Sequence, residues 1–237
     1  MEPLLQALIF STLAGVAIPL GALLAKFEHI RPNWLEAEFR HSVIALGGGV
    51  LLAAVALVLI PEGSGRLDPI SVMLAFGGGG FLFFLVDRAL ARTGGSASQL
   101  MAMLLDFVPE AIAMGALMAE GGASGLLLAI LIGLQNFPEG FNAYRELMPN
   151  DHFTSRGILL AFSGLVLLGP IAAFLGMAYG SSSPAAMGLM MLVAAGGILY
   201  LTFQDIAPQA QLEKAWAPAL GAVAGFMVGL LGQMLVG

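Results

Sequence analysis

The feature that most constrains this chain is its division into eight apolar stretches, each long enough to cross a bilayer as a helix of roughly 20 residues. Of its 237 residues, 59% are hydrophobic and 10% are charged, and the mean hydropathy is +0.93. Short turn-like connections, such as 61–65 and 181–184, leave no room for a folded domain outside the membrane. We expect an all-α membrane protein, a single transmembrane domain over residues 1–237, with helices at about 4–25, 43–60, 70–86, 100–119, 125–147, 157–179, 185–206 and 218–236.

Composition excludes several function classes. The chain has no cysteine, which removes disulfides, thiolate metal sites and cysteine nucleophiles. Its formal net charge of -6 argues against binding nucleic acid, whose phosphates need a basic surface. We expect no cofactor and no enzymatic activity, and the lipid bilayer is the surrounding solvent.

The basic residues predict the orientation of the helices. Eight of the nine Lys and Arg residues fall in alternate connections, and only Arg66 lies on the opposite side. Cytoplasmic loops collect positive charge, so both termini are expected to face outside. The eight are Lys26, Arg31, Arg40, Arg88, Arg92, Arg145, Arg156 and Lys214.

Internal similarity indicates inverted repeats in a 3+2+3 arrangement. The helices predicted at 43–60 and 185–206 both start Gly-rich and end near a proline and an acidic residue. The two central helices share a second element, D-F-V-P-E-A at 106–111 and Q-N-F-P-E-G at 135–140. Transporters are often built from such repeats, with the substrate site near the midplane.

Ionisable side chains inside a membrane cost several kcal/mol unless they are paired or hydrated, so each is a candidate functional residue. Asp106 and Glu110 are spaced i,i+4 on one predicted helix, and Gln135 and Glu139 have the same spacing on the next. Asp205 lies in the seventh predicted helix. These carboxylates need a bound cation or protons to neutralise them, and two facing helices supply four oxygen ligands.

Prolines and amides surround these carboxylates. Pro109 and Pro138 precede the two glutamates and leave the carbonyls of Leu105 and Leu134 without a helical donor. Further polar residues at this level either join helices by hydrogen bonds or line an ion pathway, with the first role at least as well supported. They are Asn136, Asn142 and Gln204, beside Asp205. The three histidines, His29, His41 and His152, fall in or beside cytoplasmic segments, so the site is built without imidazole.

These motifs, in this order over essentially the whole chain, resemble the ZIP family of divalent metal transporters. The family's fourth-helix motif, H-N-x-P-E-G or H-N-x-x-D-G, corresponds to 106–111, and its fifth-helix motif to 135–140. The sixth helix carries F-S-G-L, and the seventh-helix element corresponds to 196–210. The resemblance implies an eight-helix bundle with both termini outside, a homodimer, and a metal site between the fourth and fifth helices.

Departures from the family motifs predict how many metal ions the site binds. Asp106 and Phe107 replace the usual His and Asn, Gln204-Asp205 replaces His-Glu, and Leu167 stands where some members carry an acid. Members with two adjacent metals use that Asn and that acid for the second site. Because both positions are apolar here, we predict one metal ion, held by Asp106, Glu110, Gln135 and Glu139.

The predicted function is transport of divalent metal cations of the zinc, manganese or iron class, with the metal as substrate. All-oxygen ligands favour harder cations such as manganese, magnesium or ferrous iron, and zinc stays compatible. The alternative is a ZIP-like protein that has lost transport and acts as a sensor or scaffold. A distant alternative is an intramembrane aspartyl protease using Asp106 and Asp205, whose G-x-G-D and Y-D motifs are absent. Short loops suggest a prokaryotic cell membrane.

Overall fold

The computed structural model describes residues 2–28, 33–93, 97–149, 153–180, 183–212 and 216–236, without the side chains of 33–36, 91, 93 and 97–105. Predictions for His29, Arg31, His152 and Lys214 lie outside the described residues. Within these ranges the chain is helical and has no strand, which confirms the predicted all-α class.

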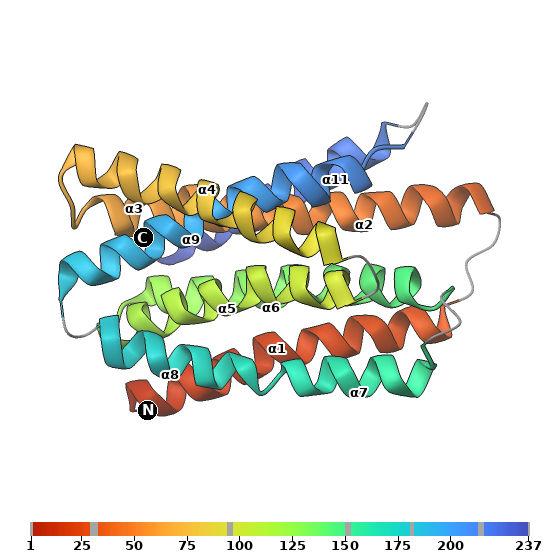
Figure 1. Cartoon of the computed structure of the whole chain (residues 1–237), viewed down its shortest axis with the longest axis horizontal. Helices are drawn as coiled ribbons and strands as arrows, with labels where there is room; N and C mark the ends of the chain where they lie inside the picture. The colour runs from red at the N-terminus through yellow and green to blue at the C-terminus, as the bar shows by residue number, and fades with distance from the viewer. Residues whose placement is uncertain are drawn as a thin grey trace.

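The helices of the described residues form eight rods, some of them interrupted (Figure 1). Uninterrupted rods are α1 (Pro3–Phe27), α4 (Pro69–Thr93), α5 (Ala97–Ala119), α6 (Ala123–Leu147) and α11 (Ala217–Val236). Three rods are composite: α2 (Asn33–Ala53) with η1 (Ala54–Leu59) and α3 (Ile60–Ser64); α7 (Ser155–Leu165) with α8 (Leu168–Gly180); and α9 (Pro184–Leu201) with η2 (Thr202–Ile206) and α10 (Ala207–Gln209).

In the part of the chain that the structure describes, six helical segments are long and apolar enough to cross a membrane. The chain therefore has the architecture of a multi-pass membrane protein. Helices α5 and α6 are not among the six, and α6 carries Gln135, Asn136 and Glu139, which lower its hydropathy. The six segments are Pro3–Phe27, Ala37–Ser64, Pro69–Leu90, Ser155–Gly180, Pro184–Gln209 and Ala217–Val236.

Two boundaries predicted from hydropathy are wrong. The second helix was expected at 43–60 after a loop, but it starts at Asn33, so Arg40 lies within a helix. The same rod continues through Ser64, so the segment 61–65 is mostly the last turn of a helix rather than a connection. In both places polar residues extend an apolar helix beyond its apolar window.

Side-chain caps fix the start of three helices. Asp68 accepts hydrogen bonds from the backbone N–H groups of Ile70 (3.0 Å) and Ser71 (3.1 Å) and from the Ser71 hydroxyl at the start of α4. Hydrogen bonding by the Ser71 side chain, and by these backbone groups, holds the pKa of the Asp68 carboxyl below its usual range. Thr154 and Ser183 accept from backbone N–H groups at the starts of α7 and α9.

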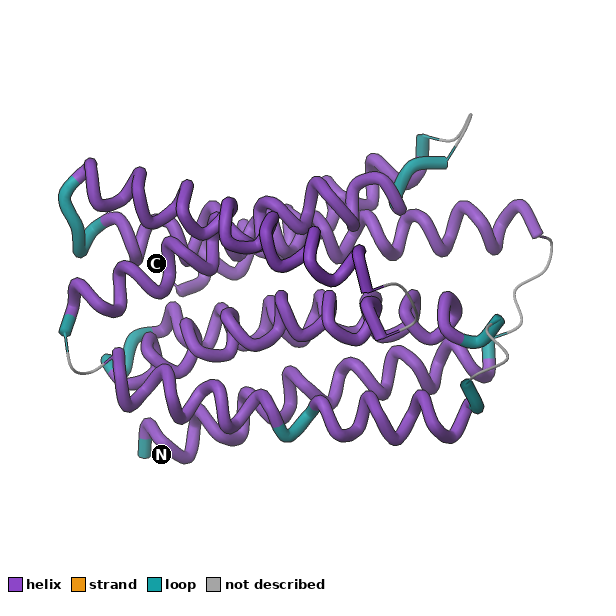
Figure 2. The backbone as a smooth tube through the Cα atoms, in the orientation of Figure 1, coloured by secondary structure: helices purple, strands orange, loops and turns teal. Residues whose placement is uncertain are grey.

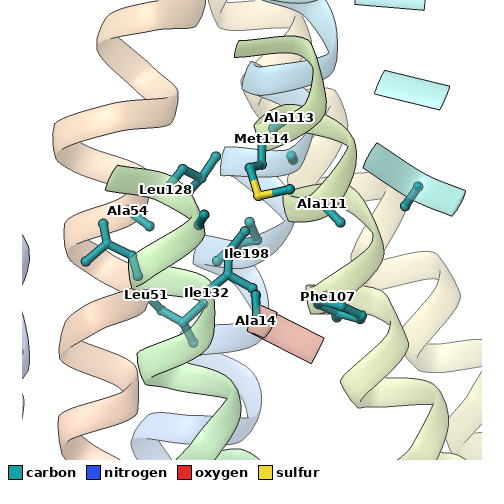
Figure 3. Close-up of a cluster of buried hydrophobic side chains, with 14 of the residues drawn as sticks. Ala14, Leu51, Ala54, Phe107, Ala111, Ala113, Met114, Leu128, Ile132 and Ile198 are labelled. Atoms are coloured by element: carbon teal, nitrogen blue, oxygen red, sulfur yellow. The ribbon is translucent and has the colours of Figure 1, made fainter. Parts of the chain in front are cut away.

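The rods form two layers, as Figures 1 and 2 show. One layer holds α1, α5, α6, α7 and α8, and the other holds α2, α3, α4, α9 and α11. Packing is closest within the layers, and α2 against α6 and α5 against α9 join one layer to the other. The buried core lies between them. Figure 3 shows part of it, with side chains from α1, α2, η1, α5, α6 and α9 that include Ala14, Leu51, Ala54, Met114, Ile132 and Ile198.

Glycines allow the closest helix contacts. In the α1–α6 pair, a Cβ added to Gly21 would lie 2.0 Å from the Phe137 carbonyl oxygen, and one added to Gly140 would lie 2.1 Å from the Ile18 carbonyl oxygen. Each helix thus presents one glycine to the backbone of the other. The same reciprocal arrangement occurs in α5–α8 with Gly115 and Gly176, in α2–α11 with Gly49 and Gly225, and in α4–α9 with Gly79 and Gly196.

Two helices contain a π-helical segment immediately before a proline. The N–H of Ile60 donates to the carbonyl of Val55 in η1, and the N–H of Ala207 donates to the carbonyl of Thr202 in η2, which is the i to i+5 pattern. A proline follows each donor, at 61 and at 208. The wider turn is a way to accommodate a proline ring that would otherwise meet the carbonyl four residues back.

Ion pairs and hydrogen bonds join the two layers at both ends of the bundle. At one end, Arg66 Nη2 lies 2.6 Å from Glu120 Oε2 at the end of α5. At the other end, Arg40 Nη2 of α2 lies 3.5 Å from Glu146 Oε1 of α6. We call these the Arg66 end and the Arg40 end. Buried polar side chains lie between them.

Candidate metal site between α5 and α6

Helices α5 and α6 pack against each other and bring the predicted i,i+4 pairs together. Gln135 Nε2 of α6 donates a hydrogen bond to Glu110 Oε2 of α5, and both residues are fully buried. Asp106 is also buried, at 7% exposure, and Glu139 is partly buried. Pro109 and Pro138 lie inside the two helices, each directly before its glutamate.

The three carboxylates of this region interact electrostatically. Asp106 is within range of Glu110, and Glu139 is within range of both. Like charges in a low-dielectric interior repel strongly, so these groups are not all ionised together without a compensating cation. Protons or a metal ion supply that compensation.

Among the described side chains of this region, five buried oxygen atoms have no hydrogen-bond partner. They are Asp106 Oδ1, Glu110 Oε1, Gln135 Oε1, Asn136 Oδ1 and Glu139 Oε1. A buried acceptor without a partner costs about 1–3 kcal/mol, so a cluster of them is rarely tolerated for packing alone. All five are acceptors of the kind that hard metal cations take as ligands.

The described residues do not enclose a metal ion as they stand. Among them, no three His, Asp or Glu side chains come close enough to hold one together. The Glu110–Gln135 hydrogen bond explains part of this, because it turns the amide nitrogen of Gln135 toward the carboxylate. Which amide atom faces Glu110 is exchangeable by rotation of the side chain. A cation would favour the rotamer that presents Gln135 Oε1 beside the carboxylates.

The amide residues at this level have different surroundings. Asn136 Nδ2 donates to the carbonyl of Ala14 at 2.9 Å and so joins α6 to α1, while its Oδ1 stays unpartnered. Asn142 lies apart from the carboxylates and contacts Arg40, Glu146 and Gln209. Asn142 therefore joins α6 to α2 and α10 by hydrogen bonds at the Arg40 end.

The two residues of the seventh-helix motif, Gln204 and Asp205, have different surroundings. Asp205 lies in η2, is partly buried, and is within electrostatic range of Asp106. Gln204 is exposed and lines a shallow surface depression with Tyr200 and Phe203. Adjacent residues of a helix point in different directions, so only Asp205 is near the carboxylates.

The structure also places Phe107 and Leu167, the two residues that the motif comparison aligned with metal ligands of the family. Phe107 is 1% exposed, and its ring lies against Gly15 of α1 and Gly169 of α8, 3.1 and 2.8 Å from where a Cβ would be. Leu167 lies in the break between α7 and α8 and is 66% exposed. Leu167, which the motif comparison aligned with an acidic residue of some family members, therefore faces outward in this structure.

Sequence reasoning missed three residues that surround Asn142. Arg40 was assigned to a loop, and neither Glu146 nor Gln209 was considered as part of a site. The i,i+4 spacing of Asn142 and Glu146 was a signal that could have found the second of these.

Comparisons with known proteins add no assignment. A scan against protein-family models finds no model that matches the chain, and a search of curated proteins finds no match.

Proposed function

We propose that this protein transports divalent metal cations across a membrane through the oxygen-lined region between α5 and α6. The observation that carries the proposal is the set of five unpartnered buried oxygens contributed by Asp106, Glu110, Gln135, Asn136 and Glu139. They lie on two packed helices at membrane depth, where each unpaired acceptor is costly. A passing cation would give a partner to the oxygens of Asp106, Glu110, Gln135 and Glu139.

The chemistry of the ligands favours a hard cation of the manganese or iron class, with zinc also accommodated. Every donor is a carboxylate or amide oxygen, and the chain has no cysteine. The proposal is for one ion, held by Asp106, Glu110, Gln135 and Glu139. The burial of Phe107 against α1 and α8, and the outward direction of Leu167, support a single ion because neither contributes a ligand.

The proposed architecture has eight membrane-spanning helices related as inverted repeats, 3+2+3, as in the ZIP-like bundle that the motifs resemble. Two observations support the repeats. The rods at 33–64 and 184–209 each contain a π-helical segment ahead of a proline. The repeat exchanges the first three rods with the last three, and α5 with α6. This exchange turns the glycine contact of α1–α6 into that of α5–α8, and the contact of α2–α11 into that of α4–α9.

The proposed mechanism has the carboxylates replace the water shell of the ion, after which the site opens to alternate sides. Without metal, Glu110 and Glu139 share a proton with their neighbours, because three adjacent buried carboxylates do not all stay ionised. Metal binding then releases protons. The distribution of Lys and Arg supports both termini outside, with the Arg40 end toward the cytoplasm of a prokaryotic cell. A homodimer is part of the same proposal.

A second candidate is a metal sensor or scaffold that does not transport. The closed Glu110–Gln135 hydrogen bond, and the lack of an enclosing carboxylate cage among the described residues, favour this candidate. Transport needs that hydrogen bond to break in every cycle, whereas a scaffold does not.

Uptake by proteoliposomes decides between the two. Manganese, iron, zinc, cobalt and cadmium are supplied in turn to wild-type protein and to Glu139→Ala. Transport predicts uptake of at least one metal that is lost in the variant. The absence of wild-type uptake for every metal would favour the sensor or scaffold.

A further inference from the structure

A small cavity lies beside Glu139 of the candidate metal site and Asn142 of the Arg40 end. It has a volume of about 50 Å³ and is lined by Glu139 and Asn142 of α6, by Gly47 and Gly48 of α2, and by Gln209 of α10, among others. The unpartnered Oε1 of Glu139 belongs to one of the lining residues. This volume has room for a few water molecules. Its lining is more apolar than polar, and Glu139, a predicted metal ligand, is one of its polar residues.

A hydrogen-bonded cluster borders this cavity, since Asn142 and Gln209 belong to both. Asn142 Oδ1 accepts from Arg40 Nε at 3.0 Å, and Asn142 Nδ2 donates to Gln209 Oε1 at 3.0 Å and to Glu146 Oε1 at 2.9 Å. Arg40 Nη2 lies 3.5 Å from the same Glu146 oxygen. The cluster ties α2, α6 and α10 together at one point.

The oxygens of this cluster form a cation-binding surface that a side chain already fills. Asn142 is 6% exposed and Glu146 is partly buried, and the guanidinium group of Arg40 lies on both of their side-chain oxygens. Guanidinium is a permanent cation. One carboxylate oxygen and two amide oxygens are also ligands that a hard metal cation accepts.

We propose that Asn142, Glu146 and Gln209 form a second, transient cation position, and that Arg40 is a tethered cation which occupies it whenever no metal ion is there. A metal ion leaving Glu139 through the cavity meets this position next. It displaces the guanidinium, which returns once the ion has gone. The proposal rests on the proposed function for the origin of the ion, and on the described contacts for the position itself.

The positively charged Arg40 side chain controls the entry of cations into the cavity. With the guanidinium in place, a second metal ion is repelled from the cavity, and the amides of Asn142 and Gln209 stay paired. The glycines at 47 and 48 keep the space open. A Cβ at Gly47 would lie 3.2 Å from the Pro138 ring, and one at Gly48 would lie 2.9 Å from Ile206 Cγ2.

Counting bound manganese tests the proposal. Purified full-length protein in detergent is titrated with Mn²⁺, and free Mn²⁺ is measured by electron paramagnetic resonance. Arg40→Gln is expected to bind one more ion per chain than wild type does. The double variant Arg40→Gln/Glu146→Gln is expected to return to the wild-type number, because the vacated position has lost its carboxylate.

Three further variants control for charge and folding. Arg40→Met is a second neutral replacement in case Arg40→Gln fails to fold, and is also expected to gain one ion. Arg40→Lys keeps a tethered cation and is expected to gain none. Arg88→Gln removes the same charge from an exposed position on α4 and is also expected to gain none.

Two results would overturn the proposal: no additional ion in either neutral Arg40 variant, or an additional ion that persists after Glu146→Gln. Because the readout is a difference between variants, it is separate from the proposed function. A wild-type count of zero would contradict the site between α5 and α6, while the difference would still report on the second position.

Discussion

Gln135 of α6 donates a hydrogen bond to Glu110 of α5, and both side chains are completely buried. This contact satisfies one oxygen of Glu110 and leaves the other, together with Gln135 Oε1, without a partner. The pair is thus half-satisfied in a place where polar groups are expensive. Under the proposed function, rotation of the Gln135 side chain would let the amide and the carboxylate both turn an oxygen to the transported ion.

Removing the Gln135 amide should destabilise the protein, because the buried Glu110 carboxylate then loses its hydrogen-bond donor. In Gln135→Leu, Glu110 keeps no hydrogen-bond donor, and the free energy of unfolding is expected to fall by about 1–3 kcal/mol. Metal uptake is expected to fall as well, because one ligand is lost. Denaturant unfolding in detergent and proteoliposome uptake measure the two effects. Leu134→Ala, at a more exposed position of the same helix, is the control and should change uptake little.

The close approach of α1 and α6 predicts a strict size limit at Gly21. In Gly21→Ala, the new Cβ would lie 2.0 Å from the Phe137 carbonyl oxygen, so the helices must separate. Such overpacking typically costs about 1–3 kcal/mol. Gly78→Ala is the matched control, since nothing lies within 4 Å of a Cβ at that position. Equal unfolding midpoints for the two variants would contradict the described packing of α1 on α6.

The place of Phe107 predicts what restoring a family ligand would do. Phe107→Asn removes a ring packed on Gly15 and Gly169 and is expected to lower stability by roughly the 3–5 kcal/mol seen when buried aromatic side chains are truncated. It should not add a second metal ion, because position 107 faces α1 and α8. Unfolding and Mn²⁺ binding stoichiometry measure both parts. A gain of one bound ion would contradict the assignment, and Phe107→Leu controls for loss of the ring alone.

Uptake should depend on pH in one direction. Protons and metal ions compete for Asp106, Glu110 and Glu139, and a protonated carboxyl group is a poor ligand. Uptake is therefore expected to rise as pH increases between about 5.5 and 8, because fewer protons are then available to compete with the metal ion. The measurement is the initial rate of manganese uptake at constant free manganese. A rate that stays constant across this range would contradict proton sharing at the site.

Hydropathy predicted the helical class and the number of rods well, but not where the helices end. The helix predicted at 43–60 covers 33–64, because polar residues at its ends, including Arg40 and Glu62, are still helical. The break at Val166 and Leu167 was missed for the opposite reason, since the residues around it are all apolar. Apolar windows record solvent preference, whereas a helix ends where its backbone hydrogen bonds end.

The candidate site was predictable as a set of residues but not as a geometry. The i,i+4 spacing places Asp106 with Glu110 and Gln135 with Glu139, and the structure brings the two pairs together. Spacing along one helix says nothing about rotation against another, so the outward direction of Leu167 and the approach of Arg40 to Asn142 were not foreseeable. Contacts between helices depend on packing, which here is set largely by glycine positions.

The most direct test of the central claim is a crystal structure with manganese, in which anomalous scattering locates the metal. The account predicts one manganese peak between α5 and α6, coordinated by Asp106, Glu110, Gln135 and Glu139, with the Gln135 side chain rotated so that its oxygen faces the ion. Absence of metal from this region would contradict it, and two ions bridged by Glu110 and Glu139 would contradict the single-ion site.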